Sequence, residues 1–395
     1  MENSRDKLFD FAALCFWILA SIAFAAYVFL AFGQDFRGYY AAGRVLLERG
    51  NPYDYARVAQ VLIDVTGSAG NNPFYYPLWF GWLFVPFTLL PFQTARAVWM
   101  FINWALWIFG LFRMQQLLNF PARNWRGWML FLLGTLLFAW TTWKFEQAGV
   151  LLFVLTIEIL ISYEKRQWHR MGVFMALVLI KPNIMVLPIA ALGLWLILNR
   201  KWQPVWTALL VLATLVVVTT ILTPGWYRPF LQPNFGQGLT EVLDGPGQVT
   251  GERLNSTLLD WLKWFSIPET LRYGIYLVVA LAALWILWRS LRTSKSILEV
   301  TALALLASYA ITPYALQYDF PPLVFVLFWA LAELRNERGK TIPVLIVIFM
   351  SSVLIWERPI SDGYWIVIGL IALTVRMERS VKRPVLLEQS LSHTK

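Results

Sequence analysis

The sequence predicts an all-α polytopic membrane protein with about twelve transmembrane helices and two further helices in the membrane interface. Hydrophobic residues make up 58% of its 395 residues and charged residues only 14%, whereas soluble domains carry about 25% charged residues. Apolar runs near the length of a bilayer-crossing helix recur along the chain. Lys and Arg gather in short connections between these runs, which is typical of cytoplasmic loops.

The N-terminal apolar run, residues 10–32, is expected to remain as a membrane anchor. Acidic residues precede it, and it lacks the basic region and small-residue cleavage site of a signal peptide. The run contains Cys15, the single cysteine of the chain. One thiol excludes an internal disulfide and a multi-cysteine zinc site.

The basic connections, for example those around Lys165, Arg200 and Arg289, set the direction of the later crossings. With these connections and both termini in the cytoplasm, residues 1–395 form one integral domain of the cell (plasma) membrane. The predicted crossings are 10–32, 94–113, 127–143, 148–163, 170–181, 183–199, 204–222, 270–289, 297–313, 319–335, 341–356 and 361–377.

Two large segments, 33–93 and 223–269, then lie outside the cell. In the first of them, the apolar spacing of Tyr39–Arg49 predicts an amphipathic helix that stops before Gly50. Residues 51–54, Asn-Pro-Tyr-Asp, predict a turn directly after this helix.

The segment 72–92 is apolar enough to cross the bilayer, but we expect it to lie in the interface. Counting it as a crossing would move every later basic connection outside. Its internal prolines and many aromatic residues favour a tilted or re-entrant amphipathic helix at the level of the headgroups. An ordinary crossing with one basic loop on the wrong side is the alternative.

Asp35 lies just beyond the first predicted crossing, where the helix dipole favours a cation over a carboxylate. Helix stability therefore does not explain a carboxylate at this position, which suggests that Asp35 has a functional role. The structural alternatives are an ion pair with Arg37 and a cap for the helix that follows.

Lys181 is the second anomaly, because it lies at the tip of an apolar hairpin with basic connections at both ends. The eleven or so residues before it reach only about 17 Å, whereas the bilayer core is about 30 Å thick. A lysine at that depth suggests a watery cavity or a bound anion. The alternative is that its side chain extends to the outer interface.

Glu146 and Gln147 directly follow a predicted crossing. We expect them to line the same cavity as Lys181, although Glu146 has a possible partner in Lys144. Glu158 lies within a crossing, and an ion pair with the nearby Lys165–Arg166 is predicted. No Asp-x-Asp pair lies near Asp35, so neither a metal nor another cofactor is expected.

Five motifs follow one another between about residues 34 and 320: DFRGYYAAGRVLLERGNPYDY, YYPLWFGWLFVPFTLLPF, FEQAGVLLFVLTIEIL, GVFMALVLIKPNIMVLPIAAL and RLNSTLLDWL. In this order they resemble glycosyltransferase family 87. The resemblance implies a GT-C-like fold and an enzyme that takes a sugar from a polyprenyl-phosphate donor at the outer membrane face. Its acceptor would be a lipid, a glycan or a protein, and no nucleic acid is involved.

The resemblance places Asp35 at the family's catalytic acid, which we expect to act as general base. We further expect Lys181, assisted by Arg37 and Arg253, to bind the donor phosphate. Residues expected at the substrates are Tyr39, Tyr40, Tyr75, Tyr76, Glu146, Gln147, Asn255, Tyr318 and Asp319.

Three positions depart from the family pattern. Glu146 stands where the family has glycine, and Leu316 and Tyr318 stand where tryptophan and histidine are expected. A different acceptor or weakened activity would follow from such changes. The rival classes are a lipid or solute transporter, which needs charged positions along a path to both faces, and a non-catalytic membrane scaffold.

Overall fold

The computed structural model describes residues 22, 26, 35–68, 74–119, 139–231 and 257–334. Every regular element within these ranges is a helix, which confirms the all-α class for this part of the chain. The predicted crossings 341–356 and 361–377, and most of 10–32 and 127–143, lie outside the described residues, as do Arg253 and Asn255. The total of about twelve crossings stays a prediction.

Three described helices are long and apolar enough to cross a membrane: α5 (Phe92–Leu118), α11 (Trp202–Leu222) and α15 (Glu269–Thr293). They correspond to three of the predicted crossings. Leu210 on α11 and Val278 on α15 are each 68% exposed. Apolar surface of this extent suits contact with lipid rather than with water.

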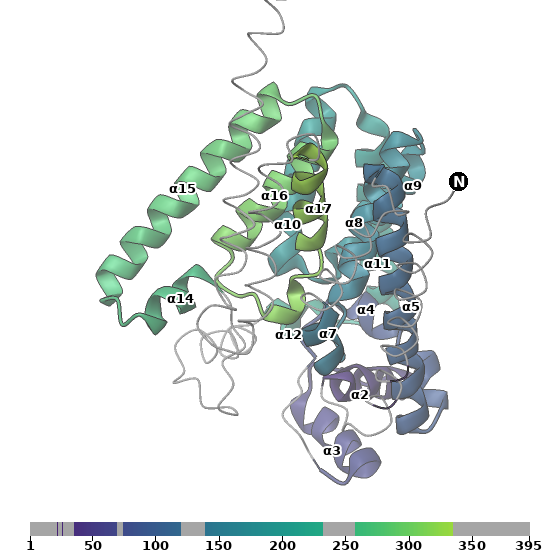
Figure 1. Cartoon of the computed structure of the whole chain (residues 1–395). Helices are drawn as coiled ribbons and strands as arrows, with labels where there is room; N and C mark the ends of the chain where they lie inside the picture. The colour runs from purple at the N-terminus through teal and green to yellow at the C-terminus, as the bar shows by residue number, and fades with distance from the viewer. Residues whose placement is uncertain are drawn as a thin grey trace, which may run out of the picture.

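Shorter apolar helices complete the bundle and begin and end near the predicted positions. In Figure 1, α5 packs against α8, α8 against α9 and α9 against α11, while α16 packs against α10, α15 and α17. The 3-10 helix η3 continues α9 up to Lys181, which separates it from α10 as the predicted hairpin requires. These elements are α8 (Gly149–Glu164), α9 (Trp168–Leu177), η3 (Val178–Ile180), α10 (Pro182–Leu198), α16 (Ile297–Ile311) and α17 (Leu323–Leu334).

The first part of the first predicted outer segment, residues 35–68, forms two helices, α2 (Phe36–Leu47) and α3 (Tyr55–Thr66), at one end of the bundle (Figure 1). Helix α2 begins three residues earlier than predicted and ends before Arg49, whose backbone is left-handed (φ 59°). Helix α3 was not predicted. Its signals are the Asp54 side chain, which accepts hydrogen bonds from two N–H groups of the first turn, and left-handed Gly67 at its end.

In the apolar segment 72–92, the described residues 74–92 form no single long helix. They fold into α4 (Leu78–Trp82) and the 3-10 helix η1 (Val85–Leu89). Together they span 78–89, which is about 18 Å at helical rise and shorter than the bilayer core. A Cβ atom on Gly43 would lie 2.8 Å from the Phe84 backbone, so η1 packs directly on α2.

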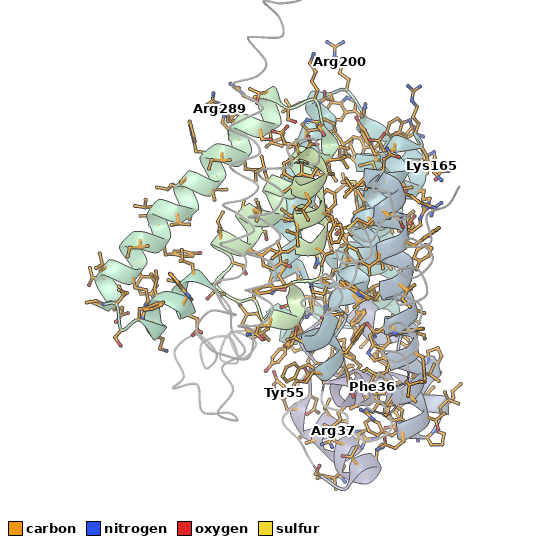
Figure 2. All side chains as sticks on the ribbon, viewed as in Figure 1. Phe36, Arg37, Tyr55, Lys165, Arg200 and Arg289 are labelled. Atoms are coloured by element: carbon orange, nitrogen blue, oxygen red, sulfur yellow. The ribbon has the colours of Figure 1, made fainter. Side chains whose placement is uncertain are left out.

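Basic side chains from three separate connections lie together at one end of the bundle. Figure 2 shows Lys165, Arg200 and Arg289 at this end and Arg37 and Tyr55 at the other. The predicted topology requires such a separation, and the membrane side of each end stays a prediction.

Glu158 forms ion pairs near the basic end, but its partners are not the predicted neighbours Lys165–Arg166. Its carboxylate contacts Arg113 of α5 and Arg170 of α9, each at 2.6 Å. The prediction was wrong because it considered only cations close in sequence. Helix packing brings α5 and α9 against α8, so their arginines reach the same carboxylate.

Candidate active site

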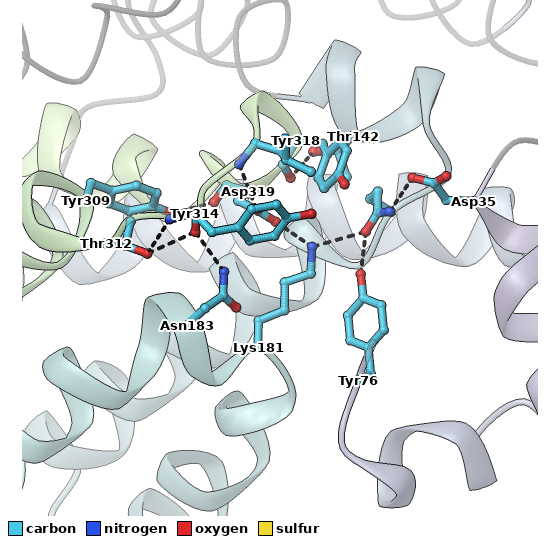
Figure 3. A network of polar contacts seen from close by, with 12 residues as sticks. Asp35, Tyr76, Thr142, Lys181, Asn183, Tyr309, Thr312, Tyr314, Tyr318 and Asp319 are labelled. Atoms are coloured by element: carbon cyan, nitrogen blue, oxygen red, sulfur yellow. Dashed lines mark hydrogen bonds and ion pairs between the residues drawn. The ribbon is translucent and has the colours of Figure 1, made fainter. Parts of the chain in front are cut away.

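The side chain of Gln147 lies at the centre of a buried polar network. Its carbonyl oxygen Oε1 lies 2.5 Å from the Tyr76 hydroxyl, 2.8 Å from the Tyr39 hydroxyl and 3.1 Å from Nζ of Lys181. Its amide nitrogen Nε2 donates to Oδ2 of Asp35. Figure 3 shows Asp35 and Lys181 on opposite sides of this amide.

The chemistry of its partners fixes the orientation of the Gln147 amide. An ammonium group has only donors and an ionised carboxylate has only acceptors. The carbonyl oxygen must therefore face Lys181 and the NH2 group must face Asp35, as observed. In the reversed orientation the NH2 group would face the Lys181 ammonium and the carbonyl oxygen would face the Asp35 carboxylate, and neither pair could form a hydrogen bond.

The buried Lys181 ammonium has a second partner in Asp319, a carboxylate that is 1% exposed. The other carboxylate oxygen of Asp319 accepts from the Leu316 N–H at 3.1 Å. The rings of Tyr318 and Tyr76 flank the ammonium, with centroids 4.7 and 5.2 Å from Nζ. Lys181 is thus held in the interior, and its side chain does not extend to a surface.

Phenol groups surround the amide and the ammonium. The Tyr39 and Tyr76 hydroxyls are 2.6 Å apart. Each also lies within hydrogen-bond distance of the Gln147 carbonyl oxygen. Burial raises the pKa of the Tyr39, Tyr76 and Tyr318 hydroxyls well above the ordinary value of a tyrosine. These three phenols are therefore neutral hydrogen-bonding groups at physiological pH.

Asp35 immediately precedes α2 and is only partly buried. Its side chain makes no capping hydrogen bond to the α2 backbone, so the predicted alternative of a helix cap is not observed. Its carboxylate instead receives the amide of Gln147, which is 112 residues away in sequence. This contact joins the first predicted outer segment to the turn before α8.

Glu146 lies beside the network and has a partner that the sequence analysis did not consider. Its carboxylate is 2.5 Å from Nε of Arg96, and both side chains are 1% exposed. Its backbone is left-handed, with φ 59°, a conformation that costs an L-residue about 1–2 kcal/mol. The Glu146 carboxylate is thus paired with a buried arginine of α5.

Tyr40 and Arg37, two other predicted site residues, donate hydrogen bonds to groups outside the network. The Tyr40 hydroxyl donates to the Leu90 carbonyl at 2.9 Å, and Tyr75 is 40% exposed. Arg37 donates to Ser68 at 3.4 Å, across to the end of α3. The roles predicted for these three residues stay predictions, and Arg253 and Asn255 lie outside the described residues.

Gly149 is a residue of the site that the sequence analysis missed. A Cβ atom on Gly149 would lie 2.0 Å from the Tyr318 carbonyl oxygen. The Thr142 hydroxyl donates to the same oxygen at 2.9 Å. This close approach of backbones holds the Gln147 turn against the segment that carries Asp319. In the sequence, the indication of this close approach was a glycine directly after a polar turn.

Metal-ligand clusters are not evident in the part of the chain that the structure describes. No group of three or more His, Cys, Asp or Glu side chains there is placed to hold a metal ion. Gln147 contacts the Asp35 carboxylate and the Lys181 ammonium, and the ammonium in turn contacts the Asp319 carboxylate.

A comparison with protein-family models matches residues 74–313 to the model described as Glycosyltransferase family 87. The matched range contains Gln147 and Lys181, whereas Asp35 and Asp319 lie outside it. No curated protein and no solved structure matches the chain.

Proposed function

The chain belongs to glycosyltransferase family 87, and we propose that it moves a sugar from a polyprenyl-phosphate donor to an acceptor hydroxyl, with inversion at the anomeric carbon. The family match covers more than half of the chain and agrees with the predicted resemblance. It makes the protein a glycosyltransferase. The family therefore favours an enzyme over a transporter or a non-catalytic scaffold.

One observation carries the proposed mechanism: a single amide connects a carboxylate and an ammonium from distant parts of the chain. Gln147 contacts Asp35 through its NH2 group and Lys181 through its carbonyl. A reaction that removes a proton from one substrate while a phosphate leaves the other requires such a pair of groups within one site.

In the proposed reaction, Asp35 takes the proton of the acceptor hydroxyl. The acceptor oxygen forms a bond to the anomeric carbon as the bond from that carbon to the phosphate oxygen breaks. The electron pair of the broken bond leaves with the polyprenyl phosphate. A positioned base contributes about 10² to 10⁴ in rate to such a step.

Lys181 is proposed to hold the departing phosphate. An ammonium group has three N–H donors, and among the described residues Gln147 and Asp319 accept two of them. The third donor is available to a phosphate oxygen. The fixed positive charge favours the charge that develops on the leaving group.

The proposal is tested with membranes that contain the parent or Asp35→Asn, supplied with labelled polyprenyl-phosphate mannose, glucose or arabinose. We expect the parent to transfer label and the variant to lose about 10² to 10⁴ in rate. Asp54→Asn is the matched control, because Asp54 belongs to the same outer segment but caps α3, a role that asparagine also fills. Equal transfer by the parent and Asp35→Asn rules out Asp35 as the base.

The stereochemistry provides a separate test of the inverting mechanism. The anomeric configuration of the purified product is compared with that of the donor by NMR. We expect opposite configurations, because a single displacement with Asp35 as base attacks the face opposite the phosphate. Retention would contradict this mechanism even if Asp35 proves essential.

A further inference from the structure

Glu146 combines a strained backbone with a buried charge. Six described residues other than glycine have positive φ: Arg49, Asn119, Glu146, Arg166, Arg200 and Ser266. Five of them are exposed, and Glu146 is the buried one. A surface position tolerates many side chains, but a buried carboxylate needs a charge partner.

The strain lies at the end of α7 (Trp140–Lys144), directly before Gln147. The Glu146 N–H donates to the Trp143 carbonyl at 3.1 Å, and the Gln147 N–H donates to the Thr142 carbonyl at 2.9 Å. These two bonds form a Schellman motif, in which the left-handed position usually holds glycine. Glu146 occupies that position.

Helix α5 holds Glu146 at two points. Arg96 pairs with its carboxylate at 2.5 Å, and the Trp99 indole N–H donates to its carbonyl at 2.8 Å. Arg96 and Trp99 are three residues apart and therefore lie on the same face of α5. Both side chains are buried. The turn cannot rotate without breaking at least one of these contacts.

We propose that the Arg96–Glu146 ion pair positions Gln147, so that its amide can join Asp35 to Lys181. The proposal rests on the proposed function for its catalytic consequence. Arg96 is a positioning residue, because the contact through which it is proposed to act is with Glu146. Misplacement of a catalytic group by about 1 Å can cost on the order of 10² in rate.

The main test uses Arg96→Met/Glu146→Gly. This double variant removes both buried charges and places glycine at the left-handed position, so it is designed to fold. We expect sugar transfer to fall by about 10². In a Gln147→Leu background the same two substitutions should cause no further loss, because the group they position is already absent. A loss that multiplies with that of Gln147→Leu would overturn the proposal.

A second readout requires no substrate. Hydrogen exchange of the backbone amides at 146–148 is measured in the purified protein, and we expect faster exchange in Arg96→Met/Glu146→Gly than in the parent. Parent-like exchange in a folded variant contradicts the proposal. If the parent transfers no sugar, the proposed function fails, while this measurement still decides whether the pair fixes the turn.

Arg113→Met is the matched control. Arg113 also lies on α5 and pairs with a carboxylate of α8, Glu158, at 2.6 Å. It is about 26 Å further along the helix than Arg96, and Glu158 keeps Arg170 as a partner in this variant. We expect parent-like transfer and parent-like exchange at 146–148. A general effect of removing an ion pair from α5 would change both measurements here as well.

Discussion

Replacing Gln147 by leucine tests whether the network is the active site. Leucine has a side chain of comparable size and suits a buried position, but it cannot form hydrogen bonds with Asp35 or Lys181. The Tyr39 and Tyr76 hydroxyls keep their own contact at 2.6 Å, and Lys181 keeps Asp319. The variant thus removes the connection between base and cation, together with the acceptor that the two tyrosine hydroxyls share.

The size of the effect follows from the two charged hydrogen bonds that the variant loses. Each is worth about 1.5–3 kcal/mol, so the pair contributes about 3–6 kcal/mol in total. A loss of about 1.4 kcal/mol in transition-state stabilisation slows a reaction tenfold. Even the lower figure, if it acts on the transition state, predicts a decrease of about 10² in the transfer rate.

The assay compares the initial rates of labelled-sugar transfer by purified parent and Gln147→Leu, after thermal unfolding has shown that the variant folds. Gln203→Leu is the control, because Gln203 is exposed and bonds to His169 on the side of the basic connections. We expect the control to transfer at the parent rate. A folded Gln147→Leu protein with the parent rate would refute the assignment of the network as the active site.

Two further predictions concern the neighbours of Gln147. Lys181→Met should lower the unfolding temperature, because it leaves Asp319 buried without its cation at a cost of about 3–5 kcal/mol. Lys181→Met/Asp319→Leu should recover stability but not sugar transfer. Transfer by this double variant at the parent rate would contradict the role of Lys181. Gly149→Ala should lower both stability and transfer, because its Cβ would lie 2.0 Å from the Tyr318 carbonyl oxygen. Gly193→Ala, which meets nothing within 4 Å, should stabilise the protein by up to about 1 kcal/mol, and equal unfolding temperatures for the two alanine variants would contradict this account.

The long helices were predictable because apolar length and flanking polar residues define a crossing. The predicted crossing 204–222 became α11 at Trp202–Leu222, and 183–199 became α10 at Pro182–Leu198. Proline at the first position of α10 also marked its start. Helix α3 was missed although Val58, Val61 and Leu62 have the spacing of one buried helix face.

The candidate site was only partly predictable. Asp35 and Lys181 stood out because each is unfavourable where the sequence puts it, one after a helix end and one within the bilayer. Gln147 was expected to line the same cavity as Lys181 because it directly follows a predicted crossing, but its central position in the network was not predicted. Its importance comes from contacts with residues 112 and 34 positions away, and one sequence cannot reveal contacts across such separations.

The departure from the family pattern at Glu146 has a physical explanation in these contacts. The resemblance places glycine there, and the observed φ of 59° is the left-handed conformation that glycine adopts without strain. A glutamate at this position needs compensation, and Arg96, 50 residues earlier, lies 2.5 Å from its carboxylate. Sequence proximity suggested Lys144, because local reasoning cannot place α5 beside this turn. The glutamate thus has a buried partner beside the Gln147 turn, while the effect of this departure on the acceptor or the activity stays a prediction.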